Sequence, residues 1–320
     1  MSTTFPLLLA LHTRELPPEV TRQLAMLREF SLTQRLTWTE TPYPECPEPQ
    51  ESPDRQSALV LGLLLEARHA HPPDDVLHWA EVAESFLKAY PLPEAAAVPL
   101  RVLALLYTAE GWRRKRHGKA ARAFQEAHEL IEAHSVEDPT VQAEMHFLAG
   151  KRDLEDRDRW ESAREHFRQA SRLYEELEDD LYRGHSLCLL ACVIHRLDFR
   201  RDSLEPTQVL LQALALLHPD HFQELFVASL LELGHHYCDR RQFPFADDLR
   251  QALGKMAPQS RGLPARVRYQ WLQARLAKAR GDRRIASESY RAGSVMVMEP
   301  LLDALGLMMT VRDGGEGKAS

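Results

Sequence analysis

The chain has 320 residues, of which 44% are hydrophobic and 27% are charged, a composition typical of a folded protein with a sizeable apolar core. Its net charge of −7 argues against a strongly basic nucleic-acid-binding protein, so no direct nucleic-acid partner is expected. The four cysteines in a chain of this length indicate a reducing compartment. No stretch resembles a signal peptide or a membrane helix. We therefore expect a cytoplasmic protein with no membrane partner.

The first 54 residues are predicted to precede the main helical body, and the helix within them is expected to fold back onto it. Residues 1–40 form an N-terminal helical segment in this interpretation, with one short helix over residues 17–30. Residues 41–54 read TPYPECPEPQESPD, and their repeated prolines predict an extended linker. At the other end, the Gly-rich residues 312–320 are predicted to form a flexible tail.

Residues 55–311 carry the helical pattern. Apolar residues recur at intervals of three and four, as at Leu103, Leu106 and Tyr107, and strand-like alternation is absent. Prolines and glycines interrupt the pattern at short spacings, which predicts short loops and antiparallel neighbouring helices. The sequence therefore predicts an all-α protein.

The predicted helices repeat. One segment places Ala163, Phe167 and Ala170 at a spacing that lets two helices approach closely while the aromatic ring fills the gap beside them. Equivalent small positions follow at intervals of 40 to 43 residues, and the aligned set is Ala120, Ala163, Pro206, Ala246 and Ala286, with Ala80 in a degenerate copy.

This pattern resembles the tetratricopeptide repeat, whose signature combines Leu-Gly-x2-Tyr with a later Ala-x3-Phe and a Pro. The best copy has Gly234, Tyr237, Ala246 and Pro258, and departs from the family at Arg250. The repeat is longer than the usual family period and is similar to the long repeats in sensor domains of bacterial regulators. The resemblance implies an α-α superhelix, a right-handed solenoid of antiparallel helix pairs, closed by a C-terminal capping helix. Armadillo and HEAT arrays, with periods near 40–47 residues, are the structural alternative.

The family resemblance also implies a concave ligand groove lined by the first helix of each pair. Carrying its groove positions onto this sequence, eleven and eight residues before the aligned small positions, gives one row with Ala109, Arg152 (or Lys151), His195, His235 and Arg275. A second row holds Trp112, Glu155 (or Leu154), Asp198, Cys238 and Lys278, and Arg268 and Trp271 point the same way. The residues predicted to bind the ligand are Trp112, His195, Asp198, His235, Cys238, Arg268, Trp271, Arg275 and Lys278.

Three cations beside an indole, Arg268, Arg275 and Lys278 around Trp271, suit a carboxylate with an apolar neighbour. The predicted partner is therefore a protein or peptide with an acidic segment. The competing interpretation is that Trp271 packs into the core and the cations form a solvated helix face.

Two other groups of residues could carry chemistry. His185, Cys188, Cys192 and His195 share one helix stripe whose ends are about 15 Å apart, so one zinc ion cannot bind all four. Two of them, Cys188 with Cys192 or Cys192 with His195, could supply ligands to a site completed by His235 and Cys238. Buried cysteine, however, commonly acts as a small hydrophobe. The basic run over residues 113–117 suits either an acidic partner or a solvated helix end. No catalytic motif is present. We therefore predict no metal, no cofactor and no enzymatic activity.

The sequence thus predicts a non-enzymatic adaptor or sensor that binds a protein or peptide in the groove of a solenoid. One alternative is a regulatory module of a bacterial transcription system, and a metal-dependent helical-repeat protein is a third hypothesis. The apolar, Met-rich segment after Tyr290 is interpreted as the capping helix, with a homodimer seam as its alternative.

Overall fold

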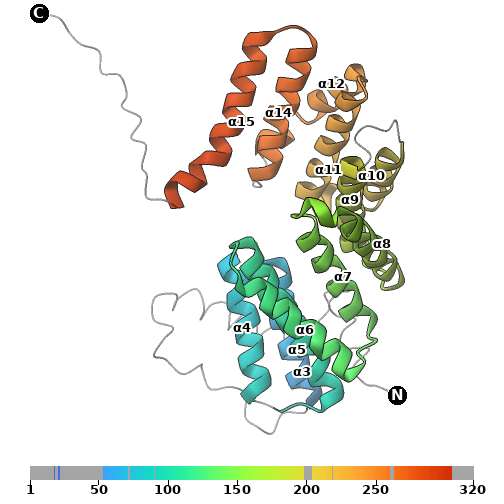
Figure 1. Ribbon diagram of the computed structural model, residues 1–320, viewed down its shortest axis with the longest axis vertical. Helices are drawn as coiled ribbons and strands as arrows, with labels where there is room; N and C mark the ends of the chain where they lie inside the picture. Colours follow the sequence, from blue (N-terminus) through green and yellow to red (C-terminus); the bar gives the residue numbers. More distant parts are fainter. Residues whose placement is uncertain are drawn as a thin grey trace, which may run out of the picture. The chain divides into compact units, whose positions relative to one another are not determined.

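The computed structural model describes residues 53–70, 73–89, 91–197, 204–217, 219–259 and 263–304, with the single positions Pro18 and Thr21. Over this part of the chain the structure is helical and contains no strand (Figure 1), which confirms the predicted all-α class. The predicted segment 1–40 (apart from those two positions), most of the 41–54 linker and the 312–320 tail lie outside the described residues.

The long helices lie in the order expected from the sequence breaks. They are α3 (Pro53–His69), α4 (Pro73–Ala89), α5 (Glu94–Arg114), α6 (Lys119–His134), α7 (Pro139–Asp153), α8 (Trp160–Glu176), α9 (Asp180–Leu197), α10 (Glu205–Leu216), α11 (Pro219–Asp239), α12 (Phe243–Ala252), α14 (Leu263–Ala279) and α15 (Arg283–Ala304). Two short elements are the 3-10 turn Arg157–Arg159 and α13 (Met256–Gln259).

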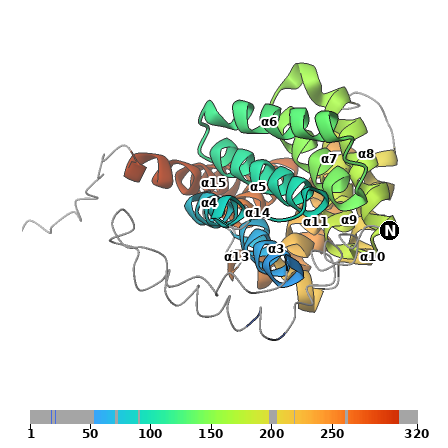
Figure 2. The same ribbon diagram turned by 90° about the horizontal axis from the view of Figure 1, so that it is seen from below.

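The chain divides into two compact units, residues 1–186 and 187–320, with the boundary inside α9. In unit 1, chain neighbours pack against each other from α3 through α6, and α7 packs on α8. Figure 2 shows α5 between α4 and α6. In unit 2, α11 packs on α12 and on α14, and α14 packs on α15.

Two helix boundaries differ from the sequence expectation. Helix α3 begins at Pro53, inside the predicted linker, because proline is well suited to the first turn of a helix, where its missing N–H is not needed. Helix α15 continues to Ala304, so the apolar residues from Val295 onward extend the last helix of unit 2. The expected separate capping helix does not begin within the described residues, and Met308 and Met309 lie beyond them.

Local signals explain where several helices start and stop. The Asp138 side chain caps α7 by accepting hydrogen bonds from the backbone N–H groups of Thr140 (2.9 Å) and Val141 (3.2 Å). Ser135 ends α6 in the left-handed region with φ 47°. Gly281, at φ 82°, makes the tight turn between α14 and α15 that a residue with a side chain would strain.

The aligned small positions of the sequence lie in the second helix of successive pairs. Ala120, Pro206, Ala246 and Ala286 belong to α6, α10, α12 and α15. In α8, Ala163, Phe167 and Ala170 are each 0% exposed. The arrangement is compatible with a helical repeat.

The core of unit 1 contains a buried ionic network. The Arg68 guanidinium of α3 lies 2.6 Å from a Glu144 carboxylate oxygen of α7 and 3.2 Å from Asp179. It also stacks 3.5 Å from the centre of the Tyr182 ring, and the Tyr174 hydroxyl donates to Glu144 at 2.9 Å. Because all these side chains are buried, each charge depends on its partners for compensation.

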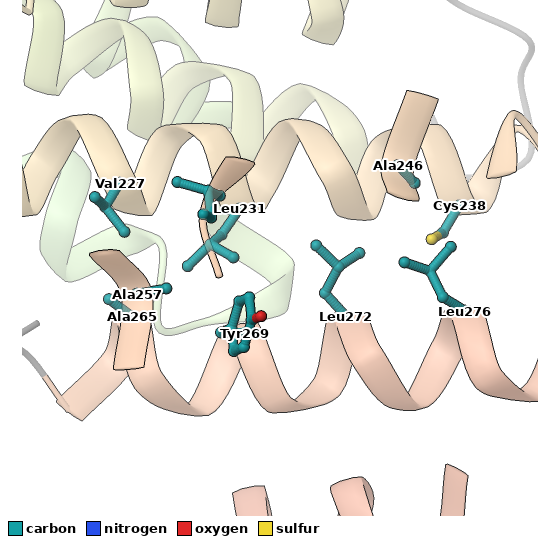
Figure 3. Close-up of a cluster of buried hydrophobic side chains, with 10 residues drawn as sticks. Val227, Leu231, Cys238, Ala246, Ala257, Ala265, Tyr269, Leu272 and Leu276 are labelled. Carbon is teal, nitrogen blue, oxygen red and sulfur yellow. The ribbon is translucent and has the colours of Figure 1, made fainter. Parts of the chain in front are cut away.

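The core of unit 2 is an apolar cluster between α11, α12, α13 and α14 (Figure 3). Leu231 of α11 and Leu272 of α14 are each fully buried at its centre, and Tyr269 covers one side. Gly234 lets α11 approach α14, since a Cβ there would lie 2.9 Å from Leu272 Cδ2. This close contact aligns the two helices whose polar faces carry the predicted ligand residues.

Candidate functional site

Several sequence-predicted residues of unit 2 meet in one polar cluster. We call it the α11 charge cluster, and it comprises His195, Glu232, His235, His236, Asp239, Arg268 and Arg275. Asp239, at the end of α11, lies 2.9 Å from His195 Nε2 of α9 and forms an ion pair with Arg275 of α14. The predicted row His195, His235 and Arg275 is therefore contiguous in space, and Asp239 joins its two ends.

The second carboxylate, Glu232, lies about two helical turns before Asp239 on α11. Glu232 lies 3.4 Å from Arg268 and 3.7 Å from His236 Nε2. His235 Nε2 donates to the Arg268 carbonyl at 3.1 Å, and its Nδ1 lies 3.4 Å from Arg275. His236 stacks on His195 with ring centroids 4.1 Å apart. Glu232 thus links α11 to α14, and Asp239 links α11 to both α9 and α14.

The surroundings of the cluster keep Asp239 charged and keep His235 and His236 neutral at neutral pH. Burial acts to raise the pKa of Asp239, but hydrogen bonds from His195 and Arg275 prevail and lower it to about 2. Burial, followed by the nearby His195, lowers the pKa of His236 to about 4. Burial also lowers the pKa of His235. At neutral pH the Arg268 and Arg275 cations are balanced by Glu232 and Asp239.

These ion pairs reduce the positive charge available at the ligand site that the sequence predicted on α14. The sequence treated Arg268 and Arg275 as cations available to an acidic ligand, but both form ion pairs with α11. Trp271 is 38% exposed and its indole packs over Gly293 of α15, where a Cβ would come within 2.6 Å of Nε1. Lys278 is exposed. The predicted α14 site therefore offers less free positive charge than its sequence indicates.

Two further predicted residues do not join the cluster as expected. Cys238 is 5% exposed and belongs to the apolar core, where burial raises the pKa of its thiol. Asp198 lies outside the described residues. Cys238 packs with Ala246 of α12 and with Leu272 and Leu276 of α14, so its side chain lies in the apolar core and not in the polar cluster.

Unit 1 contains a cavity of about 310 Å³ between α5, α6 and α7, which we call the α5–α7 cavity. Its floor is apolar and includes Leu106, Phe124 and Leu148. Three positions that the repeat alignment assigned to the groove rows, Ala109, Arg152 and Glu155, line it. The cavity thus coincides with the part of the predicted rows contributed by α5 and α7.

Cations surround the mouth of the α5–α7 cavity. Arg113 bridges Glu110 at 2.7 Å and Glu155, while Arg152 stacks 4.4 Å from the Phe124 ring centre and pairs with Asp153 at 2.8 Å. Arg116 and His117 line the same cavity from the loop before α6. Arg116 is exposed and makes no ion pair with any residue in the described part of the chain. Its guanidinium is therefore accessible to a ligand.

The Glu110 carboxylate holds three cations in place beside the cavity: Arg113, Arg114 and Lys151. Burial acts to raise its pKa, but Lys151 and Arg113 lower it well below the ordinary range. Lys151 and Arg114 both bind the same carboxylate, Arg114 at 2.8 Å. The basic run 113–117 is therefore partly anchored at its start and accessible toward its end.

Trp112 is half-buried and does not line the α5–α7 cavity. Its ring lies 4.9 Å from that of His117 and 4.7 Å from the Lys119 ammonium. These contacts fix the loop that carries Arg116, so the structure gives Trp112 a supporting position beside the cavity.

The His/Cys stripe of α9 is partly buried, with Cys188 in the core and His185, Cys192 and His195 half-buried. The Cys188 thiol lies 2.7 Å from the Ser229 hydroxyl, and burial raises its pKa to about 11. Burial likewise raises the pKa of Cys192 well above its ordinary value. Burial, then Lys151, lowers the pKa of His185 to about 3. Among the residues that the structure describes, no group of three or more His, Cys, Asp or Glu is placed to hold a metal ion.

Sequence reasoning missed Glu232 and Asp239, although a signal for them exists. They lie three residues before and four after His235 on α11, which places all three on one helix face. It identified the basic run but not that Arg113 and Arg114 are held by acids while Arg116 lines a cavity, since the anchoring acids Glu110 and Glu155 come from other turns and helices.

Comparisons with protein-family models, curated proteins and solved structures found no match. In the part of the chain that the structure describes, none of the helices has the length and apolar character needed to cross a bilayer.

Proposed function

We propose that this protein is a non-enzymatic adaptor or sensor that binds an acidic segment of a partner protein or peptide. In this proposal its helix pairs form a right-handed solenoid similar to tetratricopeptide repeats. The packing of α3 on α5, α5 on α7 and α11 on α14 supports it, because first helices of successive pairs are neighbours in such solenoids.

The observation that carries the proposal is the α5–α7 cavity with its cationic mouth. An acidic side chain of the partner would bind Arg116 and Arg152 at the mouth, and an adjacent apolar side chain would enter the floor beside Phe124. Guanidinium groups suit this task because they offer several N–H donors to one carboxylate. The position of the cavity on the predicted groove rows gives independent support.

The chemistry of the nucleophilic side chains supports a binding function over catalysis. Cys188 is buried and Cys192 is half-buried, and burial raises the pKa of both thiols, so little reactive thiolate exists at neutral pH. His185 is half-buried, and its lowered pKa keeps it neutral. The alternative of a regulatory module in a bacterial transcription system stays a prediction.

The test is affinity capture from source-cell lysate followed by a direct binding measurement. Wild type is compared with Arg116→Glu and with Arg122→Glu, a matched control on α6 whose side chain is 86% exposed and lies outside the cavity lining. A protein captured by wild type and by the control but lost with Arg116→Glu supports the proposal. Its acidic segment is then synthesised and titrated by fluorescence anisotropy, with at least about a tenfold weaker affinity expected for Arg116→Glu.

A second variant, Trp271→Ala with Lys278→Glu, tests the site that the sequence predicted on α14. It leaves the Arg275–Asp239 ion pair intact, so loss of binding reports on the ligand and not on the α11 charge cluster. Retention by Arg116→Glu and loss by this variant would move the site to α14. Equal binding by wild type and both variants would refute a cationic site for an acidic segment at either place.

A further inference from the structure

A larger cavity, of about 570 Å³, lies between α6, α7 and α8 of unit 1. We call it the histidine cavity because three imidazoles line it, one from each helix: His128, His146 and His166. Its volume falls in the range of small-molecule sites. It shares only part of its wall with the α5–α7 cavity, chiefly the Phe124 and Arg152 side chains.

The lining of the histidine cavity is divided by chemistry. Phe124, Ile131 and Met145 offer apolar surface, and the Gln142 side chain lies among them. The imidazoles and the Arg152 guanidinium supply nitrogen donors. An apolar wall opposite a few convergent polar groups is the usual composition of a ligand site.

Two of the imidazoles bind each other. The Nδ1 atoms of His146 and His166 lie 3.0 Å apart, and the ring centroids are 5.2 Å apart. The rings thus face each other through these nitrogens, so one N–H donates to the other nitrogen. A neutral pair and a singly protonated pair both keep this hydrogen bond, whereas a doubly protonated pair loses it.

The charges around the pair decide whether it takes up a proton. On α7, the Asp153 carboxylate lies 3.8 Å from His166 Nε2 and favours the protonated ring. Arg152, the residue before Asp153, favours the neutral ring. Glu165 is on α8 and favours the charged form of both rings, while His128 and Glu132 face the cavity from α6. Burial is nevertheless the largest influence and lowers the pKa of both histidines, so the pair is neutral in the empty cavity at neutral pH.

We propose that the histidine cavity binds a small organic anion, whose apolar body packs against Phe124, Ile131 and Met145 and whose acidic group is held by Arg152 and the His146–His166 pair. The pair takes up one proton when the anion enters, because the anion adds negative charge beside the two rings. The proton is drawn from solvent, so binding becomes tighter as the pH falls toward 6. This site shares Phe124 and Arg152 with the proposed site for an acidic segment, but the His146–His166 pair belongs to the histidine cavity alone.

The test uses three probes with one apolar body: phenylacetate, phenyl phosphate and the neutral 2-phenylethanol. Isothermal titration calorimetry of the full chain at pH 6 and pH 8 gives their affinities, and repetition in buffers of different ionisation enthalpy gives the proton uptake. Phenylacetate serves the pH comparison because its carboxylate stays ionised over this range. We expect it to bind about tenfold more tightly at pH 6, with net proton uptake, and the alcohol to bind at least about tenfold more weakly. Comparing phenylacetate with phenyl phosphate distinguishes a carboxylate from a phosphate ligand.

Substitutions test whether the pH-dependent binding of the anion depends on His146 and His166. His146→Asn and His166→Asn are expected to lose both the tight binding and its pH dependence, while His134→Asn, an exposed histidine at the end of α6 outside the cavity, retains them. Circular dichroism checks that each variant is folded. Failure of wild type to bind either anion, equal binding of the alcohol, or equal effects of His134→Asn and His146→Asn would overturn the proposal. His146 and His166 do not line the α5–α7 cavity, so their variants leave the partner-capture test unaffected.

Discussion

Gly150 of α7 lies directly against the ring of Phe167 of α8, where a Cβ built on the glycine would come within 2.7 Å of Phe167 Cε1. The missing side chain lets the two helices approach, and the ring, itself 0% exposed, fills the space between them. The spacing of Ala163, Phe167 and Ala170 therefore places these three side chains on the face of α8 that packs against α7.

Gly150→Ala is expected to destabilise unit 1 by about 1–3 kcal/mol, because the added methyl group overlaps a buried aromatic ring that has little room to move. Urea denaturation followed by circular dichroism measures the change. Gly118→Ala is the control, since nothing lies within 4 Å of its added Cβ. Equal stability of Gly150→Ala and Gly118→Ala would show that the helices separate at no cost.

The helical class and much of the helix order could be predicted because they depend on local pattern. Small and aromatic residues at fixed spacing place Ala163 and Phe167 on one buried face whatever the neighbouring helices do. The boundary between the two units inside α9 has no such local signal. The apolar stretch after Val295 also departs from its local signal, because Pro300 favours a helix break there and α15 nevertheless continues to Ala304.

The site was less predictable because charge pairing depends on which helices are neighbours. Counting positions along the repeat placed His195, His235 and Arg275 in one row, and they do lie together. The same counting could not reveal that Asp239 neutralises Arg275. His146 and His166 come from different helices, and no spacing within either one indicates that they meet.

Replacing Arg68 with Met is expected to cost about 3–5 kcal/mol, because Glu144 and Asp179 would keep buried charges with no guanidinium between them. Arg122→Met is the control. Arg122 is 86% exposed and pairs only with Glu126 on its own helix among the described residues, so its loss should change the free energy of unfolding by about 0.5 kcal/mol or less. Similar effects of the two substitutions would contradict a structural role for the buried network.

Stability is expected to fall as the pH drops from about 6.5 toward 4. Burial lowers the pKa of His236 to about 4 and that of His185 to about 3, so the unfolded chain binds protons in this range that the folded chain does not. Each group contributes a slope of up to about 1.4 kcal/mol per pH unit. Urea denaturation between pH 7.5 and pH 5 measures the slope.

His236→Gln should reduce that slope, because glutamine binds no proton in either state. His134→Gln, at an exposed position of α6, should leave it unchanged. A slope that His236→Gln does not alter would show that the buried imidazole of unit 2 exchanges its proton freely in the folded protein.

Asp239→Asn is expected to destabilise unit 2 by about 1–3 kcal/mol, because the amide cannot replace a carboxylate that accepts from both His195 and Arg275. The pKa of Asp239 is lowered to about 2, so its contribution is complete above about pH 4 and is lost only as the pH falls from there toward 2. The stability gap between wild type and Asp239→Asn should therefore be the same at pH 7 and pH 5. Asp248→Asn, at an exposed position of α12, is the control. A gap that narrows between pH 7 and pH 5, or an equal loss with Asp248→Asn, would mean that Asp239 does not hold α9 and α14 to α11 through its charge.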